Sequence, residues 1–189
     1  MADGTDIPAG AIGNLQLIVF AGLPGTGKSS LAEAAGRALA IPVFAKDWLE
    51  AVLVRCQLQP TTAAGPGLGF AGYELLTTLA ERQLRLGQSV ILDSVASTQT
   101  IRAQWQDLAA RHGAAWLVIE CICTDERAHR SRLNGRVRGI PDWHELTWAD
   151  VESVAAYYAP WHEPRLVLDA AQPLSDNAAA VLRYLAQAP

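Results

Sequence analysis

The chain has 189 residues, half of them apolar, so it is long enough to bury one sizeable core and too short for two comfortable domains. Its formal net charge of −4 argues against non-specific attraction to nucleic acid over the whole surface. Three cysteines and four scattered histidines form neither an even disulfide set nor a pair at metal-ligand spacing. These properties favour a cytoplasmic protein over a secreted, disulfide-rich one.

The first fourteen residues, MADGTDIPAGAIGN, carry no positive region ahead of an apolar one, unlike a secretory signal. The longest apolar runs, such as 15–23, are far too short to span a membrane. We therefore expect a flexible tail over 1–14, a single domain over 15–189 and no membrane partner.

Short, nearly continuous apolar runs alternate with segments of helical spacing along the rest of the chain. Such runs suit strands that are buried on both faces. They cover 15–21, 41–45, 89–93, 115–122 and 165–169. Apolar side chains recur at helical spacing over 31–39 and again over 75–84, ahead of Gly87. Strands separated by helices predict an α/β fold with a mostly parallel sheet and helices on both faces.

Two segments interrupt this alternation. The first, 60–72, has four glycines and two prolines in thirteen residues, which predicts a mobile loop. The second, 127–143, holds five arginines in its first twelve residues. Because binding residues are concentrated on loops, both segments are candidates for function.

The stretch FAGLPGTGKSSLAEAAG contains Gly-x-x-x-x-Gly-Lys-Ser, the P-loop or Walker A pattern, between an apolar run and a helical segment. Its glycines let backbone N–H groups approach phosphate oxygens at the positive end of the helix. Lys28 is expected to neutralise the β/γ-phosphates of ATP, and the Ser29 hydroxyl to ligate Mg²⁺. The nucleotide-binding residues that we expect are Gly22, Gly25, Thr26, Gly27, Lys28, Ser29, Ser30 and Arg132.

A magnesium-nucleotide site also needs a carboxylate near the P-loop. The run SVILDS brings Asp93 to the end of an expected strand, where it could hold Mg²⁺ directly or through water. An aspartate at such a position could instead cap a helix or form a turn. We expect Ser29 and Asp93 to be the metal-binding residues.

The pattern alone does not separate a motor, a switch and a phosphotransferase. A guanine-nucleotide switch would need an Asn-Lys-x-Asp element, but the only lysine after the P-loop, Lys46, lies between Ala45 and Asp47. Large ring motors need additional helical modules and usually a longer chain. The choice therefore narrows toward a small phosphotransferase.

Four stretches in this order and spacing, GLPGTGKSS, FAKDWLEAVL, SVILDS and RSRLNGRVRG, resemble the small P-loop kinases of the nucleoside-monophosphate-kinase-like group. Within it, the chain is most similar to predicted small-molecule kinases related to chloramphenicol phosphotransferase, to the kinase domain of polynucleotide kinase and to zeta toxins. The resemblance implies a P-loop NTPase three-layer sandwich with a five-stranded sheet. It also implies ATP as the donor and an arginine-rich lid at about 124–147.

The resemblance implies a role for Asp47 as well. In related hydroxyl kinases, an aspartate just after the second strand contacts the acceptor hydroxyl and can serve as general base. Asp47 and Glu50 also fit an Asp-x-x-Glu capping box, which would explain the pair without catalysis. Both interpretations of Asp47 stay open at this point.

The arginines of the second irregular segment lie where this group places its lid. The stretch 125–138 has a local charge of +3, which leaves −7 on the rest of the chain. A concentrated positive segment suits a clamp on polyphosphate, although a solvated arginine face is the alternative. Arg132 and Arg136 lie four apart and are expected to share one helix face. Together with Lys28 and Asp47 they form the expected catalytic set.

The acceptor side is less informative. The segment 60–72, where the acceptor loop would lie, matches no recognition motif for shikimate, gluconate, a nucleoside monophosphate or a named antibiotic. The loop 170–175 is expected to border adenine by its position alone. Aromatic residues after the lid could wall a pocket or pack in the core. They are Trp143, Trp148, Tyr157, Tyr158 and Trp161.

We therefore expect an ATP- and Mg²⁺-dependent kinase that transfers the γ-phosphoryl group to a hydroxyl of a small molecule. One alternative is a polynucleotide 5′-hydroxyl kinase, against which the acidic balance argues. The other is a non-catalytic ATP-binding module that regulates a partner. The sequence names neither the acceptor nor the oligomeric state.

Overall fold

The computed structural model of the protein describes residues 14–58 and 67–187. Five strands form one sheet in the order β2-β3-β1-β4-β5, and every neighbouring pair is parallel. The strands are β1 (Gln16–Ala21), β2 (Val43–Ala45), β3 (Val90–Asp93), β4 (Ala115–Ile122) and β5 (Leu166–Asp169). The α/β sheet predicted from the apolar runs is confirmed, with each strand within two residues of its expected bounds. The tail expected over 1–14 falls outside the described residues, apart from Asn14.

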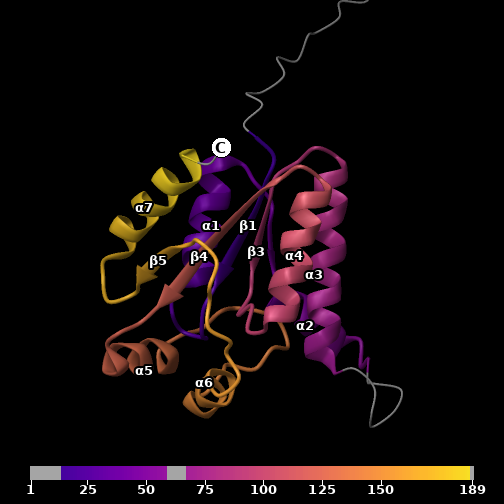
Figure 1. Ribbon diagram of the computed structural model, residues 1–189. Coiled ribbons are helices and arrows are strands. Elements are labelled where there is room, and N and C mark those ends of the chain that lie inside the picture. The colour runs from indigo at the N-terminus through magenta and orange to yellow at the C-terminus, as the bar shows by residue number, and fades with distance from the viewer. Residues whose placement is uncertain (1–13, 59–66, 188–189) are drawn as a thin grey trace, which may run out of the picture.

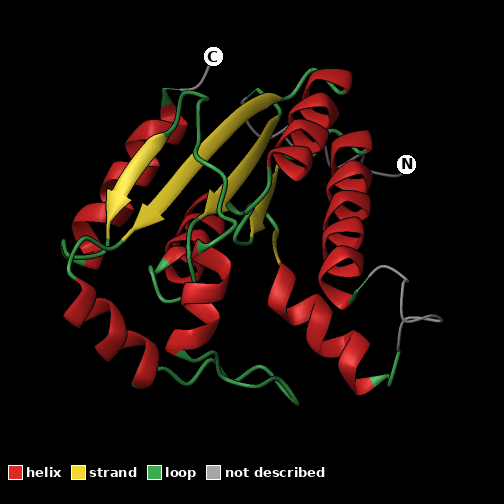
Figure 2. Ribbon diagram, turned by 60° about the horizontal axis from the view of Figure 1, so that its bottom comes forward, coloured by secondary structure: helices red, strands yellow, loops and turns green. Residues whose placement is uncertain are grey.

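Helices cover both faces of the sheet (Figure 1). On one face lie α1 and α7, and on the other α3 and α4, while α5 and α6 lie beyond the carboxyl ends of the strands (Figures 1 and 2). The helices are α1 (Lys28–Leu39), α2 (Lys46–Arg55), α3 (Leu68–Arg85), α4 (Gln99–Arg111), α5 (Glu126–Asn134), α6 (Trp148–Ala155) and α7 (Leu174–Ala186). The result is the three-layer sandwich that the resemblance implied.

The central strand β1 explains why the sheet is buried on both sides. Successive side chains of a strand point to opposite faces, and from Leu17 onward all of those in β1 are fully buried. Leu17 and Val19 pack in one core with α3 and α4, whereas Ile18 and Phe20 pack in the other with α1 and α7. A continuous apolar run is therefore required here, as in other parallel sheets covered by helices.

Two boundaries differ from the sequence-based expectation. The loop expected over 60–72 is in fact helical from Leu68 onward, and its residues 60–66 lie outside the described part of the chain. Gly72 serves helix packing there, because a Cβ at this position would lie 2.9 Å from Cγ of Glu50 in α2. Helix α5 ends at Asn134, so Arg136 lies beyond it and does not share a helix face with Arg132.

The strand register brings three chain segments together at the carboxyl ends of the strands. Asp93 at the end of β3 pairs with Phe20 of β1 on one side and with Ala45 of β2 on the other. The P-loop follows β1 directly, and α2 follows β2 at Lys46. The strand order changes direction beside β1. Open α/β sheets form a binding crevice at the carboxyl ends of the strands at such a point.

A buried arginine, Arg102 of α4, ties the loop after β3 to the segment after α6. Its guanidinium donates hydrogen bonds to the carbonyl oxygens of Ala96 at 2.8 Å, Ala159 at 2.8 Å and Pro160 at 2.9 Å. It also lies 3.7 Å above the ring of Trp161. Burial lowers the pKa of Arg102, which reflects the cost of placing its charge away from water. The three hydrogen bonds offset part of that desolvation cost.

In the described ranges, no helix combines the length and the apolar composition that crossing a bilayer requires.

Candidate active site

The P-loop is shaped by close backbone packing. Gly22, Gly25 and Gly27 all have positive φ, and a Cβ at Gly22 would lie 2.1 Å from the carbonyl oxygen of Cys121. The Thr26 hydroxyl donates to the carbonyl oxygen of Leu23 at 2.8 Å, inside the loop. Gly22 and Thr26 therefore hold the loop conformation and do not line the cavity in front of it.

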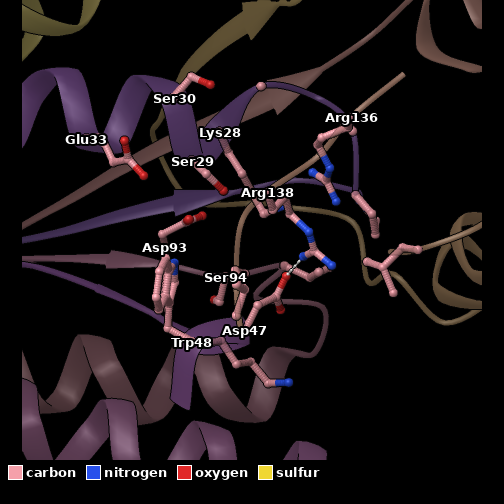
Figure 3. A pocket seen from close by; sticks show the side chains of 18 of the residues that line it. Lys28, Ser29, Ser30, Glu33, Asp47, Trp48, Asp93, Ser94, Arg136 and Arg138 are labelled. Atoms are coloured by element: carbon pink, nitrogen blue, oxygen red, sulfur yellow. Dashed lines mark hydrogen bonds and ion pairs between the residues drawn. The ribbon is translucent and has the colours of Figure 1, made fainter. Parts of the chain in front are cut away.

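A cavity of about 610 Å³ opens in front of the P-loop and extends to β2, α2 and the segment after α5. It brings together most of the residues singled out from the sequence (Figure 3). These are Gly25, Gly27, Lys28, Ser29, Ser30, Asp47, Asp93, Arg132 and Arg136. Lys28 is buried with 8% of its surface exposed, while a Cβ at Gly27 would meet no heavy atom within 4 Å. The loop thus presents one lysine and bare backbone to the cavity.

Asp93 lies at the floor of this cavity and is 5% exposed. Burial raises the pKa of its carboxyl, while the nearby Lys28 ammonium and Ser29 hydroxyl act in the opposite direction. Its Oδ1 is buried and has no hydrogen-bond partner among the described residues. Asp93 does not cap a helix, because α4 begins at Gln99 and the Thr98 side chain caps it.

The unpaired Oδ1 atom of Asp93 is the observation that fits a magnesium ion at this site. A buried carboxylate oxygen without a partner is costly unless a cation or a proton satisfies it. In Figure 3, Ser29 and Asp93 point toward one another from α1 and β3. No cluster of three or more protein ligands occurs in the described part of the chain. One carboxylate and one hydroxyl suit Mg²⁺, which keeps several waters and takes substrate phosphates as its other ligands.

Asp47 is not a helix cap. Helix α2 begins at Lys46, its N-cap is Ala45, and no side chain caps it. Glu50 pairs with Lys46, so the capping box that the sequence allowed does not form. The Asp47 carboxylate instead contacts the Arg138 guanidinium across the cavity (Figure 3).

Three arginines line the cavity: Arg132 in the last turn of α5, and Arg136 and Arg138 in the segment after it. Arg138 is fixed by Glu145, which accepts from its Nε at 3.0 Å and from its backbone N–H at 2.9 Å. The Arg136 Nε lies 3.9 Å from the same carboxylate, and burial together with Arg138 lowers the pKa of Arg136. Arg130 points elsewhere, pairing with Glu126 at 2.8 Å and lying 4.2 Å above the Trp148 ring.

Several residues of the site were missed by the sequence analysis. His129 is buried beneath the P-loop, where its Nε2 lies 2.7 Å from the Pro24 carbonyl oxygen. Glu145 orders the arginines, and no motif marks it. Trp48 and Ser94 also line the cavity, and each directly follows a residue that was singled out, Asp47 or Asp93.

The five aromatic residues singled out from the sequence after the arginine-rich segment do not line the cavity. Trp161 is 7% exposed in the core, and its Nε1 donates to the Tyr158 hydroxyl at 2.8 Å. That hydroxyl donates in turn to Glu120 at 3.0 Å. Core packing is therefore the explanation for this pair. The loop expected to border adenine ends at α7, which begins at Leu174, and its role stays a prediction.

Comparison with known proteins places this geometry in context. A family model described as AAA domain matches residues 17–160. No curated protein matches the chain.

Solved structures resemble the chain over nearly its whole length. A sugar kinase from Janibacter sp. has a TM-score of 0.68 at 17% identity, covering 91% of this chain and 95% of that one. For a gluconokinase from Sinorhizobium meliloti the TM-score is 0.66 at 19% identity, with 91% and 92% covered. The APS kinase of Mycobacterium tuberculosis in complex with AMPPNP and APS gives 0.62 at 19% identity, with 92% and 99% covered. At these identities the similarity establishes the fold.

Proposed function

The chain belongs to the AAA domain family, and from this premise we propose that it is an ATP- and Mg²⁺-dependent kinase that phosphorylates a hydroxyl of a small molecule. The observation that carries the proposal is that one cavity, of about 610 Å³, has the P-loop on one wall and the Asp47 carboxylate on another. In Figure 3, Asp47 lies across from Lys28 and Ser29. A carboxylate that faces the P-loop across the same cavity favours a phosphoryl acceptor over a non-catalytic module.

The donor half of the cavity supports binding of the ATP phosphates. The bare backbone around Gly27 and the start of α1 offer N–H groups and a positive helix end to the phosphate oxygens. Lys28 adds a fixed positive charge at the same point. Arg132 and Arg136, on the segment at about 124–147 that we propose to act as a lid, would stabilise charge that develops on the transferring group.

Ser29 and Asp93 would hold the metal ion. The metal would supply charge neutralisation to the phosphates at this position. Asp93 would take part as a carboxylate, and burial, which raises its pKa, opposes that ionisation. The positive charge of Lys28 favours the ionised form, so the two residues are linked in loading the site.

The acceptor half centres on Asp47. The acceptor oxygen would form a bond to the γ-phosphorus while the bond from that phosphorus to the β,γ-bridging oxygen breaks, releasing ADP. Asp47 would orient the hydroxyl and take its proton. The contact with Arg138 keeps the carboxylate from rotating away, and Glu145 in turn fixes Arg138.

The test is transfer of labelled γ-phosphoryl from ATP to a panel of nucleosides, sugars, antibiotics and a 5′-hydroxyl oligonucleotide. We expect a phosphorylated product with one small-molecule class and none with Lys28→Ala, which should also weaken ATP binding at least about tenfold. The proposal fails if the protein binds no nucleotide and Lys28→Ala behaves as the parent does. Product on the oligonucleotide alone, weakening steeply with salt, would favour the polynucleotide alternative.

A further inference from the structure

The polar side chains at the acceptor end of the cavity are largely engaged with one another. The Arg138 guanidinium contacts Asp47 Oδ2 and also donates to Glu145 at 3.0 Å and to the His144 carbonyl oxygen at 2.9 Å. Lys46 pairs with Glu50 and lies 4.7 Å from the centre of the Tyr73 ring. Neither cation is therefore available to a ligand without breaking an existing contact.

The cation that faces Asp47 is also neutralised already. Arg138 contacts two carboxylates, Asp47 and Glu145. In Figure 3 the Arg136 guanidinium lies on the side of Lys28, where the phosphates would bind. The Arg136 Nε, which has no hydrogen-bond partner among the described residues, therefore serves the phosphate side. An anionic acceptor beside Asp47 would meet only the engaged Arg138, so that desolvating it there would be costly.

Much of the remaining lining that the described residues give the cavity near Asp47 is apolar. Trp48 and Val137 keep 48% and 88% of their surface exposed, although both line the cavity. Other apolar side chains continue these walls from β2, α2 and the lid: Phe44, Leu49, Ile140 and Leu146. Apolar walls with a few placed polar groups are typical of pockets that bind a largely apolar small molecule.

Among the described residues beside Asp47, two polar side-chain atoms are placed to bond such a molecule. Only Oδ2 of Asp47 contacts Arg138, which leaves Oδ1 for the acceptor hydroxyl. The Ser94 Oγ is buried and has no hydrogen-bond partner among the residues that the structure describes. In Figure 3, Ser94 lies between the Trp48 ring and Asp47. The site can therefore satisfy one reacting hydroxyl and one further polar group.

Resting on the proposed kinase activity, we propose that the acceptor is a neutral alcohol with an aromatic or branched-alkyl body and at most two polar groups. Its apolar body packs on Trp48, and its hydroxyl meets Asp47 Oδ1. A polyhydroxylated sugar, a sugar acid or a phosphate ester would leave several of its polar groups unpaired against the apolar walls, at a cost for each group.

The test measures acceptor binding by calorimetry with the full chain in the presence of AMPPNP and Mg²⁺, so that it does not depend on turnover. The probes are 2-phenylethanol, 3-phenyl-1,2-propanediol, glucose and gluconate. We expect the two phenyl alcohols to bind at least about tenfold more tightly than glucose and gluconate. Equal or tighter binding of glucose or gluconate overturns the inference, and so does the absence of binding by both phenyl alcohols.

Substitutions in α2 supply matched controls. Trp48→Ala should weaken binding of the phenyl alcohols at least about tenfold, whereas Trp48→Phe should keep it within about threefold because it retains an aromatic face. Val52 is also exposed on α2 but does not line the cavity, so Val52→Ala should leave binding unchanged. Unchanged binding in Trp48→Ala contradicts the inference.

The two proposals can fail separately. If the phenyl alcohols bind as expected but receive no label from ATP, the kinase activity is wrong while the ligand class stands. If label passes to glucose or gluconate and not to the phenyl alcohols, the kinase activity stands while the ligand class is wrong.

Discussion

The buried Asp93 carboxyl lowers the stability of the folded protein at neutral pH, at the position where a metal ligand is proposed. Burial raises its pKa in the folded chain, so the carboxyl holds its proton to a higher pH folded than unfolded. Below about pH 4 both states are protonated and the group costs nothing. As the pH rises above that value, ionisation favours the unfolded state, and the cost reaches its full size once the pH exceeds the folded pKa.

We therefore predict that Asp93→Asn stabilises the ligand-free protein at pH 7, with a gain that disappears below about pH 4. The same variant should lose most of the stabilisation that ATP and Mg²⁺ give the parent chain, because an amide is a poor magnesium ligand. Thermal unfolding between pH 3 and pH 8, with and without the nucleotide and metal, measures both effects.

Asp107, exposed on α4, provides the control: Asp107→Asn should change stability by less than about 0.5 kcal/mol. A ligand-free Asp93→Asn chain that is less stable than the parent at pH 7 would contradict the account.

At the same scale, some residues of the site could be predicted and others could not. Lys28 and Ser29 were predictable because the P-loop is a local motif whose neighbours along the chain are its neighbours in space. The contact between Asp47 and Arg138 joins positions 91 residues apart, which no local pattern encodes. Glu145 acts by positioning Arg138, and no sequence motif marks a residue with that role.

Helix α2 carries Asp47 and Trp48 into the cavity, and its packing against α3 fixes its position. Gly72 of α3 is buried against Glu50 of α2, where a Cβ would lie 2.9 Å from the Glu50 Cγ. Glu50 cannot move freely because it pairs with Lys46, and burial raises its pKa. The helices can pack this closely only while position 72 has no side chain.

We predict that Gly72→Ala lowers the free energy of unfolding by about 1–3 kcal/mol, through overpacking. Gly69 is its match in the same helix, since its added Cβ would meet Glu50 at an ordinary 3.7 Å. Gly69→Ala should be neutral or slightly stabilising, because alanine is the better helix former. Urea unfolding of both variants measures the difference, and equal stabilities would contradict the packing argument.

Whole elements were predicted best where burial on both faces restricts every position to apolar residues. The strands were found because a strand covered on both faces must be apolar at every position. The start of α3 was missed because its glycines were interpreted as loop residues, whereas Gly72 lies inside the helix and allows the close approach of α2. The end of α5 was missed because four-residue spacing continues past Asn134 in the sequence but not in the helix.

On the scale of the whole molecule, Arg102 joins parts of the chain that would otherwise meet only through the sheet. Its three hydrogen bonds hold the loop after Asp93 against the segment after α6. Arg102→Ala leaves three carbonyl oxygens without this partner and opens a cavity under Trp161. We predict a loss of about 3–5 kcal/mol in the free energy of unfolding.

Chemical unfolding of Arg102→Ala beside Arg111→Ala measures this loss. Arg111 is exposed at the end of the same helix, so its substitution should stay within about 0.5 kcal/mol of the parent. Similar values for the two variants would show that the buried guanidinium does not connect these segments.

The central claim is that one cavity holds the ATP phosphates and an acceptor hydroxyl, with Asp47 serving the acceptor. The most direct measurement is the transfer rate from labelled ATP for the parent and for Asp47→Asn, with ATP affinity measured on the same samples. We predict that transfer falls about 10²–10⁴-fold while ATP affinity stays within about threefold. Transfer that survives the substitution, or a loss explained entirely by weaker ATP binding, would contradict it.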